Sequence, residues 1–290
     1  DIEPQELRSR IERMGDSMVV VGDEGIIKIH IHTNDPGKVL EIAGKHGQLD
    51  RMKIENMRLQ QQSLMADKKE EPKPYGIISV SMGSGIAHIM KDFGVDTVIE
   101  GGQTMNPSTQ DFIKAINNVN AEKIIILPNN SNIILAANQA KELSEKNVEV
   151  IPTKTVPQAI SALMVFEPSE DFETNTENMM EAMKTVKSGQ VTYAVRDTEI
   201  DGKTIKQNDF MGIGDKSILS VGTDLRATTL EMVDAMVDED SAIVSIYFGS
   251  DSDEDSANEL AAAIEEKYPD VEVEVNDGGQ PIYYYVISVE

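Results

Sequence analysis

Residues 75–85 read YGIISVSMGSG, an apolar run that ends in a junction of glycine and serine. The run has the length and composition of a buried strand, and the pattern that follows it is helical. Three more apolar runs, DTVIE, KIIILP and VEVIP, follow at intervals of about 25 residues. Helical patterns separate them at 84–93, 107–119 and 130–146. This alternation predicts an α/β fold with a doubly wound parallel sheet.

The chain beyond this sheet predicts an added β-hairpin and α+β subdomain. Its expected elements, in order, are helices at 156–166 and 173–187, hairpins within 190–222 with turns at 201–202 and 214–215, a helix at 224–237, a strand at 242–249, a helix at 253–267, and strands at 271–275 and 283–289. The turn residues are those that hairpins prefer.

Residues 1–66 predict a small separate unit. Its expected elements are a helix at 4–14, strands at 17–21 and 26–32, a helix from Asp35-Pro36 to Gly47, and a strand within 48–57. A ferredoxin-like unit has the order strand, helix, strand, strand, helix, strand. The unit therefore predicts a ferredoxin-like domain without its first strand.

Charge and composition support a division of the chain near residue 70. Residues 67–74, DKKEEPKP, are charged, contain proline and show no apolar periodicity, which indicates a linker. Residues 1–66 carry a net charge of −2, whereas residues 75–290 carry −23. We therefore expect a middle-type domain at 1–66, a linker at 67–74 and a larger domain at 75–290.

The net charge of −25 argues against binding to nucleic acid and to anionic membrane surfaces. No apolar run approaches the roughly 18 residues of a membrane span, so stable membrane insertion is not expected. The chain has no cysteine and no visible secretory signal, which fits a cytoplasmic protein. It opens with Asp1 rather than methionine, so we expect either a fragment or a trimmed chain.

His30 and His32 lie two residues apart in the run IIKIHIH. Side chains in a strand alternate between faces, so both imidazoles point the same way. Two imidazoles can hold a transition metal such as zinc but cannot complete its site, which needs a third protein ligand. The alternative is two half-exposed histidines on the open face of a sheet.

Four strand-to-helix junctions are rich in glycine, serine, threonine and amides. Carboxyl ends of parallel strands meet at one edge, where ligands or partners dock, so these side chains are candidates for a partner or ligand site. Helix capping, including a helix start at Pro107, explains part of this polarity. The candidates are Ser81, Gly83, Ser84, Gly85, Gln103, Thr104, Asn106, Asn129, Asn130, Thr153, Thr155 and Gln158.

No familiar catalytic motif accompanies these junctions. The sequence has no P-loop, nucleophile elbow, H-E-x-x-H or C-x-x-C motif. The loop SMGSG superficially resembles an anion-binding loop before a helix, but the match is weak and a plain tight turn is the favoured interpretation. His88 follows it on a helix. It is a single candidate for a phosphoryl acceptor or a covalent substrate ligand, and an ordinary surface or packed helix histidine is the favoured interpretation.

The junctions GGQTMNPST, LPNNSNIILAANQA and TKTVPQ, followed by GQVTYAVRDTEIDG and GGQPIYYYVISVE, resemble the C-terminal domain of the A-type subunit of fatty acid kinase. This bacterial family is related to dihydroxyacetone kinase. The stretch GDSMVVVGDEGIIKIHIHTNDPGKVLEIA is similar to the middle domain of the same family. The resemblance covers essentially the whole chain.

The resemblance implies a DegV-like C-terminal domain and a kinase that makes acyl phosphate from a fatty acid held by a DegV-type carrier, for phospholipid synthesis. ATP and magnesium would bind a separate domain, whose aspartate cluster this sequence lacks, so we expect no catalytic residue and no kinase turnover from this chain alone. The resemblance also implies that His30 and His32 join a cysteine from an earlier strand in a zinc site.

We therefore expect the chain to dock the carrier and to form a homodimer. One alternative is a stand-alone protein that binds a fatty acid or another small carboxylate, which a deep apolar pocket beside SMGSG and GGQTMN would favour. Another is a dihydroxyacetone-kinase-like substrate subunit that uses His88, which requires that side chain in a cleft.

Overall fold

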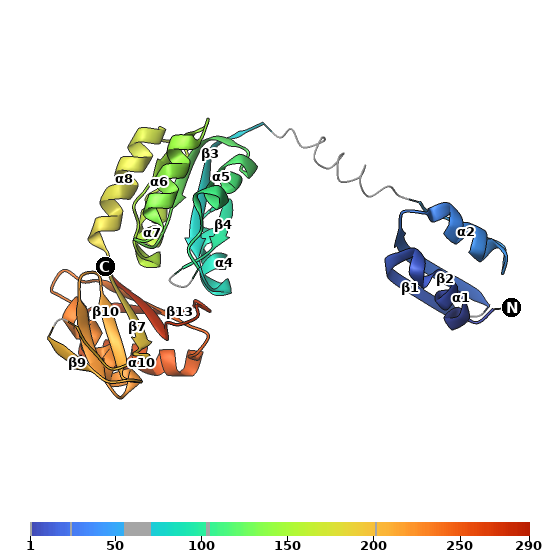
Figure 1. Ribbon diagram of the computed structural model, residues 1–290. Helices are drawn as coiled ribbons and strands as arrows, with labels where there is room; N and C mark the ends of the chain where they lie inside the picture. Colours follow the sequence, from blue (N-terminus) through green and yellow to red (C-terminus); the bar gives the residue numbers. More distant parts are fainter. Residues whose placement is uncertain (1, 24, 55–70, 103–104, 201) are drawn as a thin grey trace. The chain divides into compact units, whose positions relative to one another are not determined.

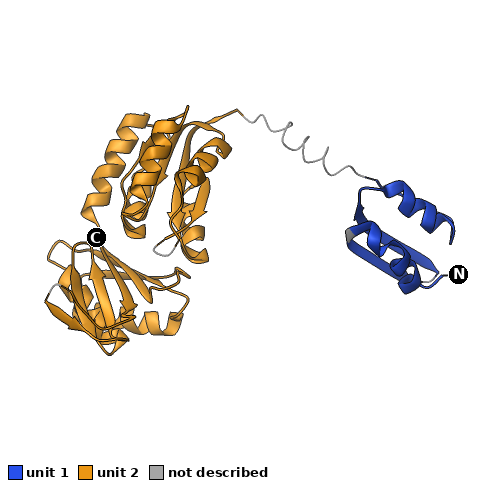
Figure 2. Cartoon of the chain, in the orientation of Figure 1, with its two compact units in different colours: residues 1–69 blue, residues 70–290 orange. Residues whose placement is uncertain are grey.

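A computed structural model describes residues 2–23, 25–54, 71–102, 105–200 and 202–290. The chain divides into two compact units, residues 1–69 and residues 70–290 (Figure 2). Within the described residues, no helix is both long enough and apolar enough to cross a bilayer.

The first unit is a two-stranded antiparallel sheet with helices packed on it. Its elements are α1 (Pro4–Ile11), η1 (Glu12–Met14), β1 (Gly15–Asp23), β2 (Ile26–Thr33) and α2 (Pro36–Gly44). The helices bury Leu7, Ile11, Val39 and Ala43, which form the small core of this unit. The strand expected within 48–57 is wrong for residues 48–54, which have no regular structure, and residues 55–57 lie outside the described residues.

The second unit begins with the parallel sheet, and residues 73–186 are called the first lobe. Its elements are β3 (Lys73–Ser81), α4 (Ser84–Asp92), β4 (Thr97–Glu100), α5 (Thr109–Asn118), β5 (Ala121–Leu127), α6 (Ile134–Leu143), β6 (Asn147–Val150), α7 (Val156–Met164) and α8 (Phe172–Thr185). The strand order is β4-β3-β5-β6 and every pairing is parallel. Figure 1 shows β3 and β4 of this sheet together with helices α4 to α8.

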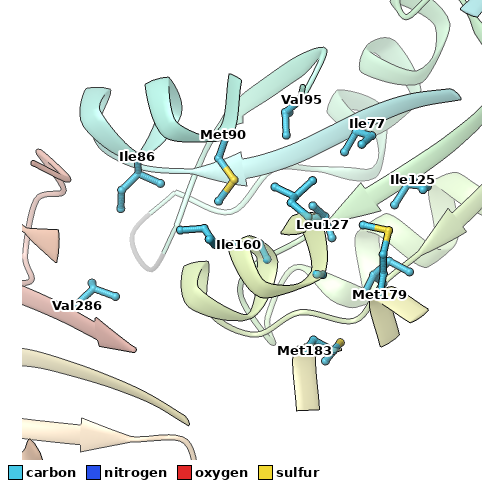
Figure 3. Close-up of a cluster of buried hydrophobic side chains, with 14 of the residues drawn as sticks. Ile77, Ile86, Met90, Val95, Ile125, Leu127, Ile160, Met179, Met183 and Val286 are labelled. Carbon is cyan, nitrogen blue, oxygen red and sulfur yellow. The ribbon is translucent and has the colours of Figure 1, made fainter. Parts of the chain in front are cut away.

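Side chains that alternate along β3 build two separate cores, one on each face of this sheet. Ile77 packs with Met90 of α4 and with residues of α7 and α8, as Figure 3 shows. Ile78 and Val80 pack with residues of α5 and α6 on the other face. Helices therefore cover both faces, and the predicted doubly wound sheet is confirmed.

Residues 187–290 form the second lobe, which has a mixed six-stranded sheet. Its elements are β7 (Lys187–Tyr193), β8 (Thr198–Ile200), β9 (Lys203–Ile205), β10 (Phe210–Gly214), β11 (Ile218–Gly222), α9 (Leu225–Met236), β12 (Ile243–Phe248), α10 (Glu254–Lys267), β13 (Glu272–Asp277) and β14 (Tyr285–Val289). The sheet order is β11-β10-β7-β14-β12-β13, and β8 and β9 form a separate hairpin. Helices α9 and α10 bury their apolar faces against this sheet.

Several boundaries differ from those expected. Lys73 and Pro74, expected in the linker, begin β3 because Lys73 N donates to Asn120 O at 2.9 Å and extends the pairing with β5. Helix α5 does not start at Pro107. Ser108 caps it in a reciprocal capping box with Asp111, which satisfies the backbone amides of both residues.

Candidate functional site

The carboxyl edge of the first-lobe sheet has a topological switch point between β3 and β5. The chain leaves β3 toward β4 on one side and returns to β5 and β6 on the other. The loops that follow β3 and β5 therefore diverge, and such a point is where open α/β sheets bind ligands. The predicted residues of SMGSG and PNNSN do lie at this point.

Asn129 spans the switch point with its side chain. Its Nδ2 donates to Ser79 Oγ at 2.9 Å and to Val80 O at 2.7 Å. Thr153 Oγ1 donates to Asn129 Oδ1 at 2.7 Å and accepts from Asn129 N at 3.1 Å. Asn129 has a φ of 59°, a left-handed conformation that asparagine tolerates better than most residues. These two predicted ligand residues thus tie the edges of β3, β5 and β6 together.

Three further predicted residues make local contacts. Asn130 Oδ1 accepts from Asn132 N at 2.9 Å, a turn that closes the loop before α6. Thr155 Oγ1 caps α7 by accepting from Gln158 N at 3.3 Å, and Gln158 Oε1 accepts from Lys154 N at 2.7 Å. Capping therefore explains more of the junction polarity than the sequence pattern indicated.

The SMGSG loop packs against the second lobe. Gly83 has a φ of 100°, and a Cβ there would lie 2.5 Å from Gly278 O. A Cβ on Gly85 would lie 2.0 Å from Asp277 O, so both glycines permit backbone to meet backbone. Ile86 N donates to Gly278 O at 3.0 Å across the contact. The second lobe therefore occupies the space beside this loop where an anion would bind.

Two buried polar atoms near this contact have no hydrogen-bond partner among the described residues, Ser81 Oγ and Gln280 Oε1. Gln280 was missed by the sequence reasoning, although it follows two glycines in GGQP. Its Nε2 donates to Tyr247 O at 2.8 Å, and burial raises the pKa of the Tyr247 hydroxyl to about 12.

The exposed part of the edge mixes apolar and amide side chains. Met105 is 51% exposed beside the exposed Asn106, and Leu135 is 68% exposed at the start of α6. The exposed Asn132 precedes Leu135 on the loop from β5. Gln103 and Thr104, also predicted here, lie outside the described residues. This edge therefore exposes two large apolar side chains, Met105 and Leu135, close in sequence to amide residues.

His88 lies on the solvent side of α4, apart from the edge loops. Its side chain is 79% exposed, and Nε2 lies 3.6 Å from Asp92 Oδ2 one turn along the helix. A covalent substrate ligand needs an enclosing cleft, so this exposure argues against the hypothesis that His88 holds a substrate.

His30 and His32 lie on the same exposed face of β2, with ring centroids 5.2 Å apart and planes at 66°. This spacing suits two ligands of one metal ion. Within the described residues, no group of three or more histidine, aspartate or glutamate side chains could hold a metal. The two imidazoles are therefore a pair without a third ligand beside them in the described part of the chain.

Comparisons with known proteins agree with this architecture. Residues 76–290 match the C-terminal domain of the FakA-like family, that of the A-type subunit of fatty acid kinase, and residues 1–64 match its middle domain. Protein YloV of Bacillus subtilis is 48% identical over 98% of this chain and 53% of its own length. An uncharacterized protein of Staphylococcus aureus strain USA300 is 44% identical over 99% of this chain and 53% of its own length. The chain spans about half the length of these relatives.

Solved structures share the fold of the second unit. The DegV family protein Cg2579 of Corynebacterium glutamicum has a TM-score of 0.55 at 14% identity, covering 75% of this chain and 97% of that protein. The fatty acid kinase B3 protein of Streptococcus pneumoniae, loaded with linoleic acid, has a TM-score of 0.52 at 12% identity, covering 74% and 99%. These likenesses confirm the DegV-like fold.

Proposed function

Because the chain belongs to the FakA-like family of fatty acid kinases, we propose that it is the docking and dimerisation portion of a bacterial fatty acid kinase. Its partner is a DegV-type protein that carries the fatty acid, and the chain supports formation of acyl phosphate for phospholipid synthesis in the cytoplasm. ATP and magnesium bind another part of the longer protein. The observation that carries this proposal is the exposed mixture of apolar and amide side chains at the carboxyl edge of the first-lobe sheet.

Packing beside the SMGSG loop favours docking over binding of a fatty acid in this chain. Gly83 and Gly85 meet the backbone of residues 277–280 directly, which leaves no room for an acyl chain at that point. Asn129 and Thr153 satisfy each other across the switch point. Side chains already paired in this way are poor groups for capturing a carboxylate, because the ligand must first break their hydrogen bonds.

The docking proposal is tested by titrating the linoleate-loaded DegV-type carrier of the same organism into this chain and into two variants of α6. Leu135→Asp places a charge at the edge, whereas Leu143→Asp makes the same change at the other end of the helix. These leucines are 68% and 66% exposed, so the pair is closely matched. We expect Leu135→Asp to weaken carrier binding at least tenfold, because it buries a charge against an apolar partner surface.

Leu143→Asp should leave carrier binding unchanged. Equal weakening by both variants, or no binding by the parent chain, would contradict docking through this edge. Tight binding of free linoleate by the chain, without carrier, would instead favour the stand-alone fatty-acid-binding alternative.

We also propose that His30 and His32 hold zinc in the full-length protein, with the remaining ligands supplied outside the described residues. Zinc content should be stoichiometric in a protein extended to the length of its relatives and should fall in its His30→Ala/His32→Ala variant. The zinc content of the extended protein and of its double variant is measured by metal analysis. Equal zinc in the two proteins would refute the assignment of His30 and His32 as zinc ligands.

A further inference from the structure

A pocket of about 310 Å³ lies between α8 and the turn that follows β6, and none of its lining residues is among the exposed edge residues named above. Met180, Met183 and Pro152 form its apolar lining. Its remaining lining residues, Glu177, Glu181 and Lys184, are exposed. Positions 177, 180, 181 and 184 share one face of α8, because residues three and four apart on a helix are neighbours.

The walls of this pocket are held in place. Thr153 N donates to Ile151 O at 2.7 Å, which forms a tight turn around Pro152, and the Thr153 side chain is fixed by Asn129. On the other wall, Ser161 Oγ of α7 donates to Ala182 O of α8 at 3.2 Å. A pocket formed before binding costs little ordering entropy when a side chain enters it. Methionine also adapts to occupants of different shape.

The charge beside the pocket is negative. Glu173, Glu177 and Glu181 recur at every fourth position of α8 and are all exposed. Consecutive positions of this stripe are separated by a rise of about 6 Å along the helix axis. Lys184 Nζ lies 2.6 Å from Glu181 Oε1, so the only basic lining residue already neutralises one of these carboxylates. An occupant therefore meets an apolar floor and a rim that attracts cations.

We propose that this pocket binds a basic segment of a partner protein, with one apolar side chain in the pocket and flanking lysine or arginine residues on the glutamate stripe. Charge complementarity selects this occupant. A fatty acid would bring its carboxylate toward Glu177 and Glu181, and a second copy of this chain would bring another strongly acidic surface, since residues 75–290 carry −23. The inference does not rest on carrier docking at the sheet edge.

The test uses the whole chain and a dye-labelled peptide in which one leucine lies between lysines, with binding followed by fluorescence anisotropy. Met180→Lys should weaken binding about tenfold by placing a cation in the pocket. Glu173→Gln/Glu177→Gln, which leaves the packing of α8 unchanged, should weaken it to a similar extent. Leu143→Lys places the same charge at an exposed position of α6, outside the pocket, and should have no effect. A peptide with serine in place of leucine should bind about tenfold more weakly.

Salt should reduce the affinity, because exposed charges are screened. The proposal is overturned if neither the Met180 nor the glutamate variant changes the affinity, or if the serine peptide binds as well as the leucine peptide. It is also overturned if linoleate displaces the peptide, or if the chain self-associates in a way that Met180→Lys abolishes. Those last two results would assign the pocket to a fatty acid or to a second copy.

Discussion

Asn129→Ala should lower the free energy of unfolding by about 3 kcal/mol, because it removes hydrogen bonds that join three strands. Asn129 Nδ2 donates to Ser79 Oγ and Val80 O, and Asn129 Oδ1 accepts from Thr153 Oγ1. Ser79 and Thr153 are both completely buried, so their polar groups would lose these partners away from water. Alanine also adopts the φ of 59° less readily than asparagine. Urea denaturation followed by circular dichroism measures the loss.

Asn208→Ala is the matched control for this change. Asn208 also has a positive φ, 72°, but it lies exposed on the turn before β10. Its replacement carries the conformational cost without the loss of a buried network, so we expect about 1 kcal/mol. Equal destabilisation by the two variants would show that backbone conformation, not the hydrogen bonds of Asn129, sets the stability of the switch point.

The position of the carboxyl edge of the first-lobe sheet could be predicted from the sequence, but the contacts that its side chains make could not. Apolar runs followed by polar junctions locate the carboxyl edge correctly, because the topology of a parallel sheet brings those junctions together. Whether an amide there faces a partner or bonds to a neighbouring strand depends on contacts between residues far apart in the chain. Asn129 and Val80 are such a pair, and no local pattern reveals it.

The same dependence on long-range contacts explains why the sequence did not predict the role of the GGQP segment or the lack of a strand at 48–54. The GGQP segment has an ordinary turn composition, and its contact with SMGSG joins residues nearly two hundred positions apart. The segment 48–57 contains apolar residues at strand-like spacing, yet a strand requires a neighbour with free backbone groups. Residues 48–54 pair with neither β1 nor β2. Local pattern predicts which residues are apolar, and tertiary context decides what they contact.

Gly85→Ala should be as damaging as the loss of Asn129, about 3 kcal/mol, because it forces backbone apart where the two lobes of the second unit meet. The new Cβ would lie 2.0 Å from Asp277 O and 2.7 Å from Asp277 C. These are backbone atoms at the end of β13, which cannot turn aside as a flexible side chain would. The start of α4 must therefore move away from the loop after β13.

This movement has a local signature, because Ile86 N donates to Gly278 O at 3.0 Å across the same contact. Amide hydrogen exchange at Ile86 should accelerate in the variant by more than global destabilisation requires, as the lobes separate without unfolding. Gly94→Ala is the control, since Gly94 has a φ of 86° but open space around its Cα. Gly94→Ala should lower the free energy of unfolding by about 1 kcal/mol through backbone strain alone. Amide exchange at Ile86 should then accelerate only as much as this global destabilisation requires. If Gly85→Ala lowers the free energy of unfolding no more than Gly94→Ala does, then the close backbone contact at Gly85 does not hold the two lobes together.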